Sequence, residues 1–191
     1  MSETGERIVV EYGPGDVPFT RWLKKDYQGD RTVLVEKDPE TVEWLKKNIL
    51  KPEDKIVVAT AQDETLASDL IFVKDMFGRQ SHGETREEDM IGKKLVGNVE
   101  EIAKRWFANC KPGGKVMIVE TYIPYPREEL IKYFTQSGFI VEKQIEKADL
   151  SKELIGDLLP DNSNKEAFVV GNAVLNEGAA NSYALILQKP I

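Results

Sequence analysis

Two glycines and three acid or amide residues stand where a parallel sheet would bring them together. Gly13 and Gly15 flank a proline after the apolar run that begins at Ile8. Glu36 ends the apolar run TVLVE, and Gln62-Asp63 follow the run KIVVA. The carboxyl ends of parallel strands share one edge of an open α/β sheet, beside the switch point where ligands bind. These positions therefore favour a site for a nucleotide-like ligand.

Each of these residue types has a chemical reason to bind such a ligand. Glycine reaches φ > 0, and its missing Cβ lets a ligand approach the backbone at Gly13 and Gly15. The carboxylate of Glu36 is placed to accept hydrogen bonds from both hydroxyls of a ribose. The alternatives are a plain tight turn at Gly-Pro-Gly and a solvated or helix-starting acid at Glu36. Because these features would lie at one edge of the sheet, their combination favours the ligand site.

Strand and helix signals alternate along the chain, which predicts a parallel sheet covered by helices on both faces. The expected strands begin at Ile8 and cover 32–36, 55–59, 69–74, 115–121, 139–145 and 182–187. The expected helices cover 19–27, 39–50, 98–108 and 150–159, and another runs from Pro126 to a stop at Gly138. Asp38-Pro39 is typical of an N-cap followed by the first helical residue, and 111–114 of a turn.

The domain organisation is expected to be simple. The 191 residues contain no internal repeat, low-complexity tract or composition shift, so we expect a single domain spanning 1–191. Residues 75–92 follow the fourth strand, where they would overhang the site as a lid. Residues 148–180 are a second candidate lid, or a surface for a homo-oligomer.

Composition excludes several function classes. The net charge of −7 gives no general attraction to phosphate backbones, so nucleic acid is a disfavoured partner. With one cysteine and one histidine, a zinc site of the common Cys/His type is excluded, and Cys110 is expected to be a buried structural thiol. The polar N-terminus and the lack of a long apolar run predict a cytoplasmic protein without a membrane span.

The motifs along the chain, taken in order, resemble those of class I S-adenosylmethionine-dependent methyltransferases. The resemblance extends from Arg7 to about Ile145 and resumes at the last strand. The matching segments are 11–15 (EYGPG), 35–39 (VEKDP), 69–72 (DLIF), 111–115 (KPGGK) and 137–139 (SGF). Each segment is weakly specific alone, and their order and spacing carry the resemblance.

The resemblance implies a three-layer αβα sandwich with a seven-stranded, mostly parallel sheet and an antiparallel edge hairpin from the last two strands. It implies S-adenosylmethionine as the cofactor and no metal, because methyl transfer is an in-line displacement that mainly needs positioning and, for some acceptors, removal of a proton. Since the acidic charge and the segment 74–77 disfavour nucleic-acid bases, we expect a small-molecule acceptor.

The resemblance also implies roles for individual residues. Glu11 would support the loop, and Gly13 and Gly15 would lie beneath the methionine portion of the cofactor. Glu36 would hold the ribose, Lys37 would lie near the adenine, and Gln62 or Asp63 would reach the adenine amine. Asp75 would stand where the active site begins.

The sequence offers three candidate catalytic residues, His82, Asp75 and Tyr122, and none of them is part of a specific motif. His82 has an ordinary pKa suited to base catalysis at neutral pH, but a lone histidine in a polar loop is more often plain surface. Asp75 is a second candidate. Tyr122 and Tyr125 follow the fifth strand, where they would line the pocket or form the edge of the core.

Two departures from the family pattern bear on function. Val17 occupies the place of a third glycine, which narrows the cofactor channel or moves the helix start. The segment 74–77 (KDMF) does not match the motif of enzymes that methylate amino groups of nucleic-acid bases. The alternatives are a degenerate methyltransferase fold that only binds or regulates, and an NAD-dependent oxidoreductase. The oxidoreductase is disfavoured because Pro18 stands at the last glycine position of its fingerprint.

Overall fold

The computed structural model describes residues 5–15, 18–48, 50, 54–59, 66–77, 99–121, 125–154 and 182–191. Within these ranges, seven strands form one sheet in the order β3-β2-β1-β4-β5-β7-β6. The strands are β1 (Ile8–Tyr12), β2 (Arg31–Glu36), β3 (Lys55–Val58), β4 (Ser68–Lys74), β5 (Cys110–Glu120), β6 (Ile140–Glu146) and β7 (Tyr183–Gln188). The α-helices in the described part are α1 (Pro39–Asn48), α2 (Val99–Asn109), α3 (Arg127–Gln136) and α4 (Leu150–Leu154).

The sheet combines a parallel part and an antiparallel edge. Strands β1 to β5 pair in parallel. Strand β7 lies between β5 and β6 and is antiparallel to both. The predicted seven-stranded sheet with an antiparallel edge hairpin is therefore confirmed.

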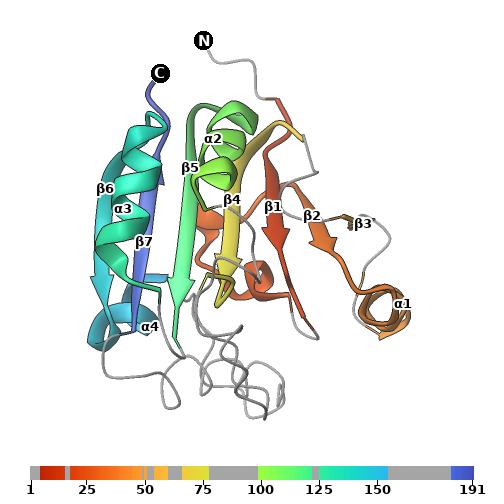
Figure 1. Ribbon diagram of the computed structural model, residues 1–191. Helices are drawn as coiled ribbons and strands as arrows, with labels where there is room; N and C mark the ends of the chain where they lie inside the picture. The colour runs from red at the N-terminus through yellow and green to blue at the C-terminus, as the bar shows by residue number, and fades with distance from the viewer. Residues whose placement is uncertain are drawn as a thin grey trace.

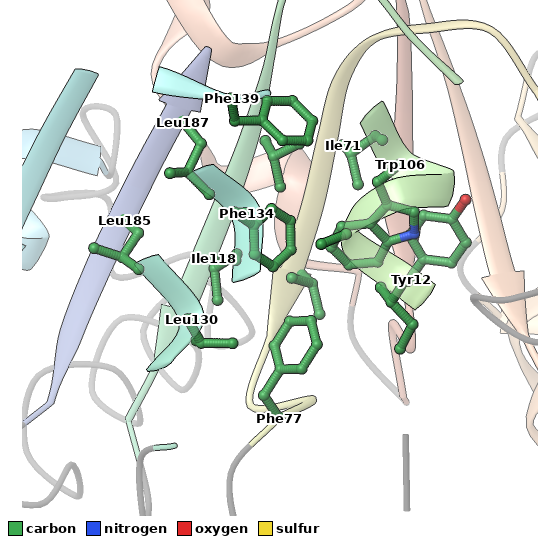
Figure 2. Close-up of a cluster of buried hydrophobic side chains, with 14 of the residues drawn as sticks. Tyr12, Ile71, Phe77, Trp106, Ile118, Leu130, Phe134, Phe139, Leu185 and Leu187 are labelled. Atoms are coloured by element: carbon green, nitrogen blue, oxygen red, sulfur yellow. The ribbon is translucent and has the colours of Figure 1, made fainter. Parts of the chain in front are cut away.

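The buried apolar side chains of the sheet form two clusters, one on each face, and Figure 1 shows α2 and α3 lying over the same face of the sheet. On one face, α2 and α3 pack on the sheet through Trp106 and Phe134. Trp106 stacks on Tyr12 with ring centroids 5.0 Å apart and meets Phe77 edge-on at 5.9 Å (Figure 2). Such aromatic pairs each stabilise the fold by about 0.5–1.5 kcal/mol beyond their buried area. They hold Phe77, three residues after the end of β4, against the core.

The opposite face shows one difference from the prediction. The expected helix at 19–27 is wrong: two 3-10 helices, η1 (Phe19–Trp22) and η2 (Lys25–Tyr27), are separated by Leu23 and Lys24 in extended conformation. Leu23 is buried in the core of this face, and the Lys24 N–H donates to the carbonyl of Leu154 at 3.0 Å. Tertiary contacts with α4 thus outweigh the helical spacing of the segment.

The predicted turn at 111–114 lies inside β5, where the strand bulges. Ser68 pairs with Cys110 but Leu70 with Lys115, so β5 has extra residues opposite β4. Gly113 supports this bulge with φ +76°, and its N–H donates to the carbonyl of Lys189 at 3.0 Å. The residues that look like a connection therefore continue the sheet.

Several local predictions hold. Asp38 caps α1, because its Oδ2 accepts hydrogen bonds from the N–H and hydroxyl of Thr41 at 3.0 and 2.6 Å. Gly138 ends α3 with φ +110°. Cys110 is buried, and burial raises the pKa of its thiol to about 11, as expected for a structural cysteine. Of the expected helix at 150–159, residues 155–159 lie outside the described residues.

Among the described residues, no helix is long and apolar enough to cross a membrane. The same part of the chain contains no group of three or more acidic, histidine or cysteine side chains that could hold a metal ion.

Candidate functional site

The glycine turn after β1 exposes its backbone to a ligand. Gly13 and Gly15 adopt φ of +63° and +56°, which side chains disfavour. A Cβ added at either position would meet no atom of the described residues within 4 Å, so these residues leave the space beside the backbone open. The Gly13 N–H donates to the carbonyl of Val35 at 2.9 Å and ties the turn to the end of β2. This open, fixed backbone suits close approach of a ligand.

Glu11, at the end of β1, contacts the segment that follows this turn. Its side chain is buried at 2% exposure. One carboxylate oxygen accepts the N–H of Phe19 at 2.6 Å, and the other accepts the N–H and hydroxyl of Thr20 at 3.1 and 2.5 Å. The carboxylate thereby satisfies the first backbone donors of η1. Glu11 thus fixes the start of η1; support of the glycine loop and a contact with a ligand amine stay predictions.

Glu36 lies beside the glycine turn at the end of β2. Tyr12 pairs with Val35, so Gly13 and Glu36 are next in register. Oε1 of Glu36 accepts the N–H groups of Lys37 and Asp38 at 2.8 and 3.0 Å, which fixes the carboxylate. No donor in the described ranges reaches Oε2. Glu36 is 8% exposed; that its second oxygen accepts hydroxyl groups of a ligand stays a prediction.

Of the remaining predicted cofactor and catalytic residues, the structure describes Lys37 and Asp75. Lys37 is exposed directly after Glu36. The other four predicted positions, Gln62, Asp63, His82 and Tyr122, lie outside the described residues, as does Val17.

Asp75, predicted at the start of the active site, is directed toward β5. Its φ is +51°, the one positive value for a non-glycine residue in the described ranges. The hydroxyl of Thr121 lies 2.9 and 2.7 Å from its two carboxylate oxygens, and the Thr121 N–H also donates to it. Lys74 forms an ion pair with the same carboxylate. A left-handed conformation costs about 1–2 kcal/mol, which these contacts offset.

Glu120, at the end of β5, is a buried acid at this edge of the sheet that the sequence analysis did not single out. It is 1% exposed, and its two oxygens accept the N–H groups of Phe77 at 3.1 Å and Tyr125 at 3.3 Å. The signal was present, because Glu120 ends a buried strand in the same way as Glu11 and Glu36 do. The segments after β4 and β5 are thus joined through one buried carboxylate.

Tyr125 belongs to the core edge. Its carbonyl accepts the hydroxyl of Tyr183 at 2.6 Å, and its own hydroxyl donates to Glu129 at 3.1 Å. Burial, together with this bond to Glu129, raises the pKa of Tyr125 to about 12. Burial, with the charge of Glu120, also raises the pKa of Tyr183. Both phenols are therefore neutral donors near pH 7, and they brace the segment after β5.

Comparison with solved structures places this geometry in a known fold. A Haloferax volcanii protein described as a methyltransferase, solved in complex with the Trm112 methyltransferase activator, matches 97% of this chain and 83% of its own, with 15% identity and a TM-score of 0.62. A protein described as an S-adenosylmethionine-dependent methyltransferase from Listeria monocytogenes matches 100% of this chain and 94% of its own, with 9% identity and a TM-score of 0.62.

The same fold also occurs in a protein named for a different reaction. The [4+2]-cyclase SpnF matches 98% of this chain and 76% of its own, with 14% identity and a TM-score of 0.57. No protein-family model matches the sequence, and a search of curated proteins gives no match. Together with the strand order and the antiparallel edge, the structural matches show that this chain has the fold of the class I S-adenosylmethionine-dependent methyltransferases.

Proposed function

We propose that the protein is a methyltransferase that uses S-adenosylmethionine to methylate a small molecule. The observation that carries the proposal is the adjacency of the open glycine turn, at Gly13 and Gly15, to the oriented carboxylate of Glu36. A nucleoside needs these two features together: backbone without Cβ on one side and an acceptor for the ribose hydroxyls on the other.

Different residues at this edge would bind the ribose, the methionine portion and the adenine of the cofactor. Oε2 of Glu36 would accept the ribose hydroxyls, and the open backbone at Gly13 and Gly15 would admit the methionine portion. Lys37, exposed beside Glu36, would lie near the adenine. When bound, the cofactor supplies a methyl group on a positively charged sulfur.

The chain's contribution to the reaction is mainly positioning. The acceptor's lone pair forms a bond to the methyl carbon while the carbon–sulfur bond breaks, and the sulfur keeps that electron pair. Holding the two reactants in line supplies most of the rate in such a displacement. In the described ranges, Glu11, Glu36, Asp75 and Glu120 all accept backbone hydrogen bonds. Their fixed carboxylates suit orientation more than proton removal.

A small-molecule acceptor is supported by charge and by the segment after β4. The net charge of −7 disfavours approach to a nucleic-acid backbone. The segment 74–77 (KDMF) also does not match the motif of enzymes that methylate amino groups of nucleic-acid bases. A cytoplasmic location, self-association and a lid at 75–92 or 148–180 stay predictions.

A second candidate function is a protein of the same fold that binds the cofactor without transferring its methyl group. Two observations favour it: the hydrogen-bonded state of every described acid at this edge, and the occurrence of the fold in a cyclase. Fold alone does not determine the reaction.

Calorimetric titration with S-adenosylmethionine, S-adenosylhomocysteine and NAD tests the proposal. We expect binding of the first two and none of NAD; binding of NAD alone would overturn the proposal. Formation of S-adenosylhomocysteine in the presence of a panel of amines, phenols and carboxylic acids then separates the two candidates. Binding without turnover of any acceptor in the panel favours the second one.

A further inference from the structure

We propose that Glu120 is a positioning residue for the methyl-donor end of the cofactor site. Its buried carboxylate holds the segment 75–77 beside the glycine turn and thereby sets affinity for the methionine portion, without touching the ligand. This inference rests on the proposed function.

The register of the sheet puts the segment 75–77 between the cofactor turn and the end of β5. Strand β4 pairs with β1 on one side, where Tyr12 lies opposite Val73, and with β5 on the other, where Val119 lies opposite Lys74. The residues that follow β4 are therefore flanked by the glycine turn and by Glu120. Under the proposed function, this segment lies next to the turn that would admit the methionine portion.

The burial of Glu120 indicates a specific role for its charge. A carboxylate at 1% exposure is costly unless hydrogen bonds compensate its lost hydration. Each of its oxygens accepts one backbone N–H, Oε1 from Phe77 and Oε2 from Tyr125. A glutamine would keep one acceptor oxygen but place an NH₂ group against the other N–H. The carboxylate is thus the form that joins both segments.

The hydrogen bond from the Phe77 N–H to Glu120 acts together with the packing of the Phe77 ring to fix the segment 75–77. The Phe77 ring meets Trp106 at 5.9 Å and Tyr125 at 6.4 Å, so its side chain is held in the core (Figure 2). With the backbone held by Glu120 and the ring by the core, the position of the segment is fixed. Asp75, two residues earlier, is held in its left-handed conformation by Thr121.

The test compares two ligands in the variant Glu120→Gln. Calorimetry with S-adenosylmethionine and with adenosine separates the methionine end from the nucleoside end. We expect the affinity for S-adenosylmethionine to fall about tenfold, because the segment 75–77 is no longer held beside the turn, while the affinity for adenosine changes less than about twofold. Glu142→Gln is the matched control, because its carboxylate pairs with Lys115 on the surface away from this edge.

A second variant keeps the test independent of folding. Thr121→Val preserves shape and β-branching but removes the hydroxyl that lies between the oxygens of Asp75. We expect the same selective loss of S-adenosylmethionine affinity, and circular dichroism checks that each variant is folded. Equal loss for both ligands, or no loss in the folded variants, would overturn the inference alone. Failure of the wild-type protein to bind S-adenosylmethionine would instead overturn the proposed function.

Discussion

Asp75 and Glu120 each accept a backbone hydrogen bond from the strand end that carries the other. The N–H of Thr121, next to Glu120, donates to Asp75, and the N–H of Phe77, two residues after Asp75, donates to Glu120 at 3.1 Å. The register between β4 and β5 ends at Lys74 and Val119. The Asp75 N–H still donates to the carbonyl of Val119 at 2.8 Å, and beyond it the two carboxylates join the segments that follow β4 and β5.

Replacing Glu36 should weaken binding of the nucleoside. Glu36→Ala removes the carboxylate whose Oε1 is held by Lys37 and Asp38 and whose Oε2 faces no described donor. We expect adenosine binding to weaken by about 1.5–3 kcal/mol, the range for hydrogen bonds to a charged group. Calorimetry measures this, with the exposed Glu43→Ala as control. An unchanged affinity would remove Glu36 from the site.

Adding a methyl group to the glycine turn should affect stability and binding together. Gly13→Ala and Gly15→Ala place a Cβ at φ of +63° and +56°, in space where no atom of the described residues lies within 4 Å. The left-handed conformation should lower the free energy of unfolding by about 1–2 kcal/mol in urea titrations. Because the new Cβ occupies the ligand's side of the turn, cofactor affinity should fall as well.

Gly5→Ala is the control for this pair, since its backbone lacks a positive φ and an added Cβ also meets no atom of the described residues within 4 Å. It should change neither stability nor binding. A fully stable Gly13→Ala that binds the cofactor as well as the wild type does would contradict the role given to the turn.

Removing one phenol hydroxyl should destabilise the segment after β5. Tyr183→Phe leaves the carbonyl of Tyr125 without its donor at 2.6 Å in a buried setting. We expect the free energy of unfolding to fall by about 1 kcal/mol. Tyr133→Phe removes a hydroxyl from a partly buried tyrosine on α3 and should have a smaller effect. Similar losses for both variants would argue against a specific contribution from the Tyr183 hydroxyl.

The cap of α1 should contribute a pH-dependent part of the stability. Hydrogen bonds from the hydroxyl and N–H of Thr41 lower the pKa of Asp38. A lowered pKa in the folded state means that the stabilisation is fully present above the ordinary value near pH 4 and is lost as pH falls through the lowered pKa. Asp38→Asn keeps an acceptor oxygen but removes the charge.

Thermal melting of the wild type and Asp38→Asn at a series of pH values measures this contribution. The difference in Tm should be constant between about pH 5 and 7 and should shrink below about pH 4. The exposed Asp26→Asn is the control. A difference that stays constant down to pH 2 would show that the charge of Asp38 does not stabilise α1.

The sequence predicts the local parts of this fold well, because they depend on neighbouring residues. Asp38 and Pro39 start α1, and the β-branched runs form the central strands. The prediction of a helix at 19–27 is wrong because it rests on apolar spacing. In the structure Leu23 is extended and packs in the core, and the next residue, Lys24, bonds to α4. No local pattern reports that contact, since Lys24 and Leu154 are 130 residues apart.

The candidate site shows the same division. Glu11 and Glu36 were predicted as candidates because each is an acid at the end of a buried strand, and Glu120 has the same position in its strand. Its partners, however, come from segments on both sides, and the hydroxyl that braces Tyr125 comes from Tyr183, 58 residues later. The resemblance predicts Asp75 at the start of the active site. Its orientation toward Thr121 could not be predicted, because it follows from the pairing of β4 with β5.

The position of β7 between β5 and β6 has a consequence for the order of folding. Among the described strands, β6 pairs only with β7, which begins at Tyr183, well after β6 ends at Glu146. Pairing of β6 must therefore wait for a distant segment, and contacts of this kind slow folding. Deleting β7 would leave β6 as a single unpaired strand, so losing one strand removes two from the sheet.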